Sequence, residues 1–127
     1  MKKNILGKKS LSEINKSLRN GDISTLDIAQ EVIENFNISN SSHNAFIEFN
    51  DKKITEEAIR IDKKLKGNKF YALSGIPISV KDLYGVDKYK TRAGTPRELP
   101  KKWEQQGPLI DILDDNNALI TGKTHTV

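Results

Sequence analysis

The sequence predicts an α/β fold in which amino-terminal helices lead into part of a sheet that is flanked by helices. Three segments in the first half place apolar residues three and four positions apart, as on one face of a helix. Short apolar runs rich in β-branched residues follow in the second half, as in buried strands. With 127 residues the chain has room for one core, so we expect a single domain.

Two helices are predicted at the start of the chain. Ser10, with Glu13 three residues later, has the pattern of a capping box and begins a short helix that ends near Gly21. Ser24 begins a second helix, whose apolar spacing continues to about Phe36. Both helices therefore have a clear first residue in the sequence.

The middle of the chain predicts a connector, a strand and a third helix. Residues 37–44 are rich in Asn and Ser and indicate a turn-rich connector in which His43 is exposed. A short strand is expected over 44–49. Apolar residues then recur at helical spacing over 54–65, and Gly67 provides an end.

The stretch over residues 73–82, LSGIPISVKD, is a strand-like apolar run that ends abruptly on a charged pair. Because side chains alternate along a strand, Lys81 lies on the side of Ser79, while Val80 and Asp82 lie on the other side. Lys81 and Asp82 are therefore not a simple ion pair.

The rest of the chain predicts a loop, a helix and a strand. Residues 83–106 lack helical periodicity and indicate a loop that holds at most a short strand. Pro108 suits the first turn of a helix that ends at 114–117, and 118–120 form a buried strand. The apolar side of this helix is expected to consist of Leu109, Ile110 and Leu113.

Three blocks resemble the amidase-signature hydrolases, in the order and at about the spacing of that family. They are residues 75–82 (GIPISVKD), 91–95 (TRAGT) and 118–124 (ALITGKT). The resemblance is clearest over 73–127 and implies a mixed sheet between helical layers. Thr95 stands where the family commonly has serine, and the residue before the third block departs from the family's glycine.

The resemblance implies that Lys81 is the base of a Ser-Ser-Lys triad that hydrolyses carbon–nitrogen amide bonds. The family's glycine- and serine-rich stretch, which carries both serines, lies farther along than this chain reaches. The eight glycines are never adjacent, so we expect no such turn here and no activity of this chain alone. Ser79 is about 6–7 Å from Lys81 along the strand and is not interpreted as the nucleophile.

By this resemblance, residues 1–127 are the amino-terminal part of one domain. A helical lead-in covers about 10–67, and the lysine strand with the blocks that follow covers about 70–127. The family includes free amidases, which act on a small-molecule amide, and an amide-transferring subunit that acts on charged transfer RNA; the sequence leaves both open. A homodimer, or a partner that supplies the missing sheet, is a further expectation.

The required chemistry sets a condition on Lys81. A lysine acts as a base only when it is neutral, and its unperturbed pKa of about 10.4 makes the neutral form costly at pH 7. Burial among apolar neighbours would lower that cost. Without the rest of the protein, we expect the strand at Lys81 and the strand at 118–120 to lack partners, so that the chain alone folds poorly.

The formal net charge of +4 lies in the second half, since residues 1–60 hold nine basic and nine acidic residues. The segment 88–102 is basic and lies beside aromatic residues. An alternative function is therefore a non-catalytic interaction module; nucleic-acid binding is not expected, because no recognition motif accompanies the charge. The cations are Lys88, Lys90, Arg92, Arg97, Lys101 and Lys102.

Several kinds of site are not expected. The chain has no cysteine, and its two histidines, His43 and His125, are far apart, so we predict no metal and no cofactor. His125 is interpreted as a loop residue. Residues 122–124 resemble the end of a phosphate-binding loop but lack its first glycine, so phosphate binding is not expected. No apolar run predicts a membrane span or a signal peptide, and we expect a cytoplasmic protein.

Overall fold

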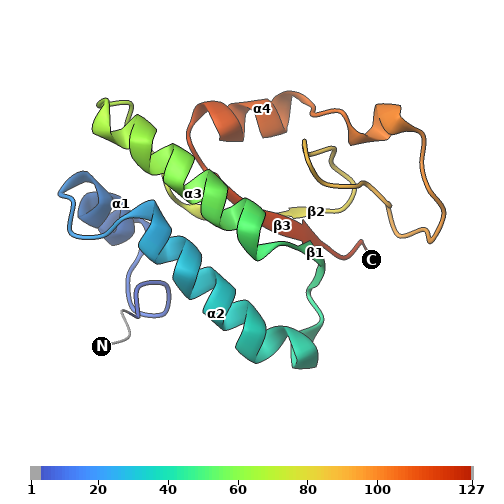
Figure 1. The fold of residues 1–127 in the computed structure, drawn as a ribbon, viewed down its shortest axis with the longest axis horizontal. Coiled ribbons are helices and arrows are strands. Elements are labelled where there is room, and N and C mark those ends of the chain that lie inside the picture. The colour runs from blue at the N-terminus through green and yellow to red at the C-terminus, as the bar shows by residue number, and fades with distance from the viewer. Residues whose placement is uncertain (1–3, 127) are drawn as a thin grey trace.

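The computed structural model describes residues 4–126, in which α-helices pack around a three-stranded sheet (Figure 1). The predicted α/β class is confirmed. In chain order the elements are α1 (Leu11–Arg19), α2 (Thr25–His43), β1 (Phe46–Phe49), α3 (Asp51–Lys66), β2 (Pro77–Lys81), the 3-10 turn η1 (Lys101–Glu104), α4 (Pro108–Asp115) and β3 (Leu119–Thr124).

The three strands form a sheet in the order β1-β3-β2, with β3 in the centre. β2 and β3 run parallel, and β1 and β3 run antiparallel, so the sheet is mixed. The expectation that the strands at Lys81 and 118–120 lack partners is wrong: they pair with each other, from Pro77 opposite Leu119 to Lys81 opposite Thr124. β3 is also longer than the predicted strand, because Thr121 to Thr124 continue the ladder.

Apolar residues pack into two clusters, one on each face of the sheet. Leu119 belongs to a cluster with buried residues of α1, α2 and α3. Its neighbour Ile120 belongs to a second cluster with Val80, Tyr89 and Ile110. Because successive side chains of a strand point to opposite faces, these two residues connect β3 to both clusters.

The first helices begin where the sequence predicts. Both Ser10 and Ser24 make complete capping boxes, with Glu13 and Asp27 respectively. Asp62 of α3 accepts the backbone N–H groups of residues 25 and 26, at 2.8 and 3.1 Å, at the first turn of α2. This contact places a negative charge at a helix amino terminus and joins α2 to α3.

Helix α2 is longer than predicted, and the connector expected over 37–44 is wrong. The helix continues to His43 and ends where Asn44 adopts a left-handed conformation, with φ of 47°. The hydroxyls of Ser39 and Ser42 donate to carbonyls one turn earlier, so they do not compete with the helical backbone. The ring of Phe36 also stacks on β1, which ties the second half of α2 to the sheet.

The segment between β2 and α4 is a loop, as predicted, and within the described residues it contains η1 but no strand. In α4, Ile110 is buried and Leu113 is partly buried, but Leu109 is 52% exposed. The prediction that Leu109 lies on the apolar side is therefore wrong. In this two-turn helix only Ile110 and Leu113, which are three residues apart, face the second cluster.

Gly122 is required where β1 and β3 approach. It has φ of +153°, and a Cβ atom would lie 2.4 Å from the carbonyl oxygen of Glu48. We expect Gly122→Ala to lower the free energy of unfolding by about 2–4 kcal/mol, because the two backbones would have to separate. Urea unfolding measures this. Gly67→Ala is the control: Gly67 has φ of −86°, and its Cβ would meet no atom closer than 3.4 Å. Equal losses in both variants would contradict the prediction.

Candidate active site

Lys81 is the last residue of β2 and its side chain is exposed. Ser79 is also exposed, whereas Val80 and Asp82 are buried, which confirms the predicted alternation. The side chain of Lys81 has no hydrogen bond or ion pair to the described residues. The apolar surroundings that a neutral lysine needs are thus not supplied by residues 4–126.

Asp82 forms a fully buried ion pair with Lys123, which lies near the carboxyl end of the central strand β3. The Nζ and Oδ1 atoms are 3.0 Å apart, and both side chains are 0% exposed. Sequence reasoning placed Asp82 opposite Lys81 but did not find its partner. The signal was present: a carboxylate directed into a core requires a cation, and Lys123 follows directly on an apolar strand.

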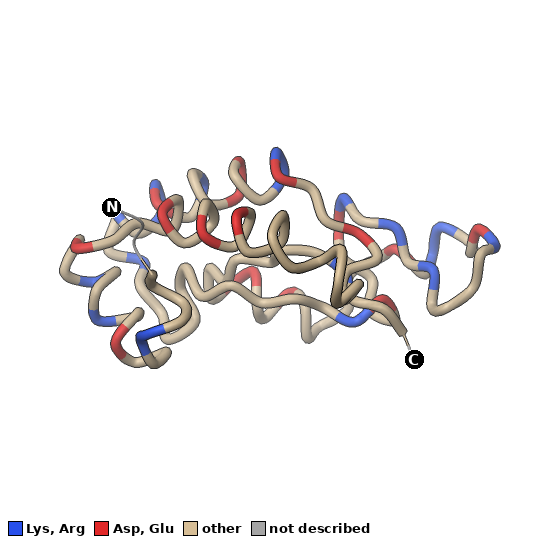
Figure 2. The backbone as a smooth tube through the Cα atoms, turned by 90° about the horizontal axis from the view of Figure 1, so that it is seen from below, with Lys and Arg blue, Asp and Glu red and all other residues tan. Residues whose placement is uncertain are grey.

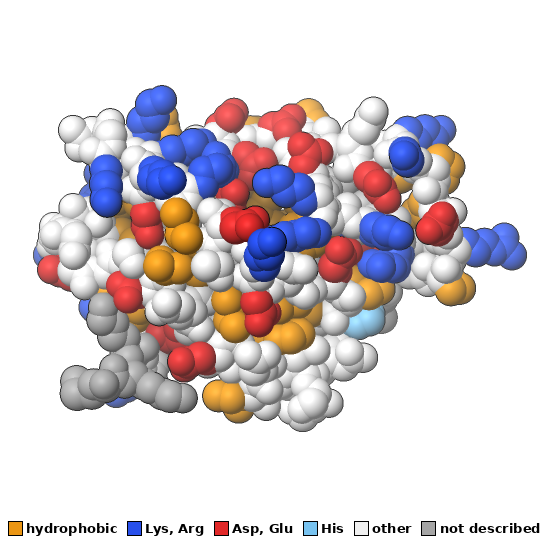
Figure 3. Space-filling view, in the orientation of Figure 1, with side chains coloured by type: hydrophobic (Ala, Val, Ile, Leu, Met, Phe, Trp, Pro, Cys, Tyr) orange, Lys and Arg blue, Asp and Glu red, His pale blue; other side chains and the backbone are white. Residues whose placement is uncertain are grey.

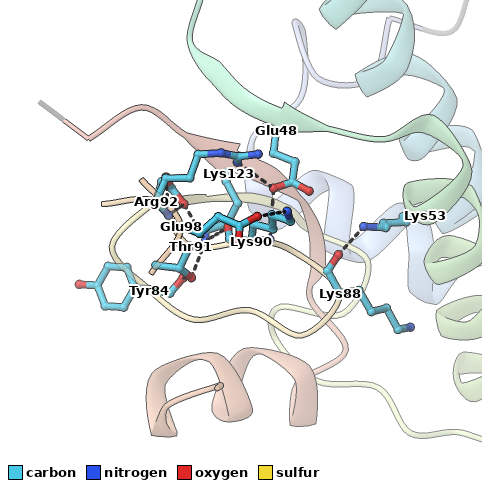
Figure 4. A network of polar contacts seen from close by, with 10 residues as sticks. Glu48, Lys53, Tyr84, Lys88, Lys90, Thr91, Arg92, Glu98 and Lys123 are labelled. Carbon is cyan, nitrogen blue, oxygen red and sulfur yellow. Dashed lines mark hydrogen bonds and ion pairs between the residues drawn. The ribbon is translucent and has the colours of Figure 1, made fainter. Parts of the chain in front are cut away.

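The buried pair is connected to the loop that follows β2. Lys123 Nζ donates to the carbonyl oxygen of Lys90 at 3.1 Å and to Oγ1 of Thr91 at 3.3 Å. The carboxylate of Asp82 accepts the backbone N–H of Arg92 at 3.1 and 3.2 Å. In Figure 4 the side chain of Lys123 points toward Thr91, with Glu48 and Arg92 beside it. All three protons of the Lys123 ammonium therefore have an acceptor, and both oxygens of Asp82 have a donor.

Backbone contacts bring the three sequence blocks to one place. The N–H of Asp82 donates to the carbonyl of Thr124 at 3.0 Å, and the N–H of Ala93 donates to the carbonyl of Asp82 at 3.0 Å. Ala93 and Gly94 both have positive φ, of 50° and 75°, so the chain turns sharply there. Blocks 75–82, 91–95 and 118–124 thus meet at the carboxyl end of β2, next to Lys81.

Glu48 of β1 ties the same loop to the other edge of the sheet. Its Oε2 accepts from the backbone N–H of Lys90 at 3.2 Å and from the guanidinium of Arg92 at 3.3 Å. The ammonium of Lys53 on α3 donates to the carbonyl of Lys88 and lies 4.6 Å from the ring centre of Tyr89. Residues 88–92 of the loop are consequently bonded to side chains of β1, α3 and β3.

Tyr89 belongs to this loop, and its side chain is buried in the second apolar cluster. Burial raises the pKa of its phenol to about 12, with further contributions from the charges of Glu48 and Glu57. Below pH 10 the phenol is neutral in both states, so its contribution to stability is complete. Between pH 10 and 12 the unfolded chain ionises first, and we expect this contribution, at most ~2.7 kcal/mol, to be lost.

The difference in tyrosinate absorbance between the parent and Tyr89→Phe isolates this titration. We expect it to have its midpoint near 12, and we expect the variant to lose less stability than the parent from pH 9.5 to 11.5. A midpoint near 10 in the difference curve would show that the phenol is not buried.

The remaining predicted residues lie elsewhere. His43 is exposed at the end of α2, and His125 is exposed after β3, where its backbone N–H donates to the carbonyl of Ala45 at 3.1 Å. Among the described residues no group of three or more His, Cys, Asp or Glu side chains is arranged to hold a metal. Within residues 4–126, no helix has the length and apolar character to cross a bilayer.

The basic segment begins against the sheet at residues 88–92, and its later part, 96–102, lies in the portion of the loop that projects at one end of the molecule (Figures 1 and 2). A cavity of about 380 Å³ in this region is lined by Lys90, Arg92, Arg97 and Lys101, together with two glutamates. Lys90 pairs with Glu98 at 3.6 Å, and both side chains are exposed. Across the face seen in Figure 3, basic and acidic side chains are interspersed.

The family model "Amidase" matches residues 27–127 of this sequence. The chain belongs to the amidase family. It is 31% identical to 2-amino-5-chloromuconic acid deaminase of Comamonas testosteroni, over 93% of this chain and 26% of the deaminase. It is 28% identical to one subunit of the glutamyl-tRNA(Gln) amidotransferase of Legionella pneumophila, over 91% of this chain and 24% of that protein.

The fold agrees with the family. A crystal structure of an amidase family protein from Bacillus anthracis superposes with a TM-score of 0.82 at 26% identity, over 97% of this chain and 25% of that one. The chain therefore spans about a quarter of the length of the amidase relatives it matches. The superposition also covers the amino-terminal helices, beyond the 73–127 region where the sequence resemblance is clearest.

Proposed function

We propose that this chain supplies Lys81 as the general base of an amidase that cleaves carbon–nitrogen bonds by a Ser-Ser-Lys mechanism. The observation that supports this most directly is the meeting of the three blocks at the end of β2, where Lys81 is exposed beside the 91–95 turn. Residues 1–127 form the amino-terminal part of one catalytic domain, with the helices at 10–67 as a lead-in.

In this mechanism neutral Lys81 accepts a proton from a bridging serine, which accepts one from the nucleophilic serine. The nucleophilic oxygen attacks the carbonyl carbon, and the proton passes to the departing amine as the carbon–nitrogen bond breaks. Water then hydrolyses the acyl-enzyme. Because the Lys81 side chain is exposed and hydrogen-bonds to no serine among residues 4–126, we place the two serines and the walls that desolvate Lys81 in polypeptide outside these residues.

The substrate is proposed to be a small-molecule amide. One relative is a deaminase of 2-amino-5-chloromuconic acid and another belongs to an amidotransferase for glutamyl-tRNA(Gln), so a small-molecule substrate and a tRNA-linked substrate both occur among similar proteins. The alternative within the family is amide transfer on charged transfer RNA. Hydrolysis of small amides in the absence of RNA would favour the first, and a strict requirement for glutamyl-tRNA would favour the second.

A partner or a second copy is proposed to complete the sheet. Within the described residues β2 pairs with β3 alone, so its other edge has unpaired backbone groups next to Lys81. Native proteins normally pair or cover a strand edge whose backbone groups are unpaired. The polypeptide that carries the serines would therefore pair with this edge.

The test uses the protein in the form that cells produce. The protein is purified through an epitope at residue 1, its intact mass is measured, and it is assayed with aryl amides and a fluorophosphonate probe that labels activated serines. We expect a species that contains more than these 127 residues, or a complex, to hydrolyse the amides and to take the label. The 127-residue chain alone should do neither, because its glycines are never adjacent and it lacks the family's glycine- and serine-rich stretch. Hydrolysis by the short chain alone, or no hydrolysis by the native species, would contradict the proposal.

The second candidate is an interaction module that uses the basic loop. The observation that favours it is the cavity lined by Lys90, Arg92, Arg97 and Lys101. An acidic protein or RNA bound there should dissociate as salt rises, and Lys101→Glu with Lys102→Glu should weaken binding by at least about tenfold. Fluorescence anisotropy at 50 and 200 mM salt measures this. Unchanged binding in the doubly reversed variant would exclude the loop as the contact.

A further inference from the structure

We infer that Asp82 and Lys123 are positioning residues, which hold the 91–95 turn and the end of β2 in the geometry that Lys81 needs. This inference rests on the proposed function and deepens it by assigning a role to two residues that do not contact the substrate. The ion pair lies on the side of β2 opposite to the Lys81 side chain, so any effect on catalysis is transmitted through the backbone.

The pair is poorly explained as a source of stability alone. Removing two charges from water is costly, and apolar residues of similar volume usually stabilise a core as well as a buried ion pair does. What the pair provides here is a set of directed contacts. Asp82 holds the N–H of Arg92, and Lys123 holds the carbonyl of Lys90 and the hydroxyl of Thr91. Three consecutive loop residues are thereby held at one point.

This attachment bears on Lys81 through two short links. Asp82 is its covalent neighbour, and the N–H of Ala93 donates to the carbonyl of Asp82 at 3.0 Å. The Tyr84 N–H donates to the carbonyl of Lys81 itself at 3.1 Å, and the Thr91 hydroxyl lies 3.4 Å from the carbonyl of Tyr84. A loop released at residues 90–92 would therefore loosen the backbone on both sides of Lys81. Small displacements of a reacting group cost up to about 100-fold in rate.

The first arm of the test does not depend on amide hydrolysis. Backbone NMR of the 127-residue chain is compared between the parent and the neutral pair Asp82→Asn/Lys123→Met. We expect the amides of Arg92 and Ala93 to exchange at least about tenfold faster, and the Lys81 backbone resonances to shift, while α3 amides keep their protection. Unchanged exchange at Arg92 and Ala93 would overturn the inference.

The second arm measures kcat and KM of the amide-hydrolysing protein. At an unchanged melting temperature we expect the neutral pair to lower kcat at least about tenfold with KM within about twofold, since a misplaced base acts on the chemical step. A purely structural pair would leave kcat unchanged once the protein is folded, and that result would overturn the inference. Glu98→Gln, which breaks an exposed pair on the same loop, is the matched control and should change neither constant.

The two arms separate this inference from the proposed function. If the parent protein hydrolyses no amide, the proposed function fails, and the NMR arm alone decides whether the pair positions Lys81. If the neutral pair does not fold, Thr91→Val removes one contact of Lys123 with little change in volume. This variant should speed exchange at Ala93 and lower kcat in the same direction. Parent values for both quantities would overturn the inference.

Discussion

Replacing Lys81 by alanine in the amide-hydrolysing protein is expected to lower kcat by about 10²–10⁴-fold, the usual contribution of a general base. The other lysine at the meeting point of the three blocks, Lys123, cannot take its place, because it is fully buried and already bonded to Asp82. Steady-state rates at saturating amide, with active sites counted by the serine probe, measure the effect. A loss below about threefold would show that another group is the base.

The same substitution separates catalysis from folding. Lys81 is exposed, and its side chain makes no hydrogen bond or ion pair within residues 4–126. Lys81→Ala should therefore change the free energy of unfolding of the 127-residue chain by no more than ~0.5 kcal/mol. Lys52→Ala, on the exposed side of α3, is the control and should affect neither rate nor stability. A large loss of stability in Lys81→Ala would point to a structural role instead.

Replacing Lys123 by methionine is expected to destabilise the protein by about 3–5 kcal/mol, because Asp82 would stay buried without its counter-charge. The two side chains are 0% exposed and 3.0 Å apart, so solvent cannot take the place of the ammonium. Urea unfolding of the 127-residue chain measures the change. A loss below about 1 kcal/mol, the value of an exposed pair, would show that water reaches the carboxylate.

The neutral pair Asp82→Asn/Lys123→Met is expected to recover most of that loss. Neither side chain is then charged, so no charge stays buried without a partner. The difference between the double and single variants gives the coupling free energy. A double variant as unstable as the single one would mean that the lost hydrogen bonds to the loop, and not the unpaired charge, carry the cost.

Local structure followed from local signals wherever caps and periodicity agreed. Ser10, Ser24 and Gly67 mark helix ends that the structure confirms within a few residues. The alternation along residues 79–82 predicted which side chains are exposed and which are buried. These features depend on neighbours within one turn or one strand, and that information is present in the sequence.

The tertiary structure decided what depends on partners distant in the sequence. Local composition ended α2 near Phe36, but the helix continues to His43, and Phe36 stacks on Phe49 of β1. The pairing of β2 with β3 joins residues about 43 apart, and no local pattern specifies such a register. The three amidase blocks could be recognised in the sequence by resemblance. The sequence did not show that they come together at the carboxyl end of β2.

The sequence by itself determined the α/β class, the helix starts, the amidase resemblance and the exposed face that Lys81 shares with Ser79. Only the tertiary structure showed that Asp82 has Lys123 as its partner, because a buried charge selects its counter-charge by distance in space and not by spacing along the chain. The same contact brings the 91–95 turn to the end of β2, since the donors and acceptors of the turn are satisfied by that pair.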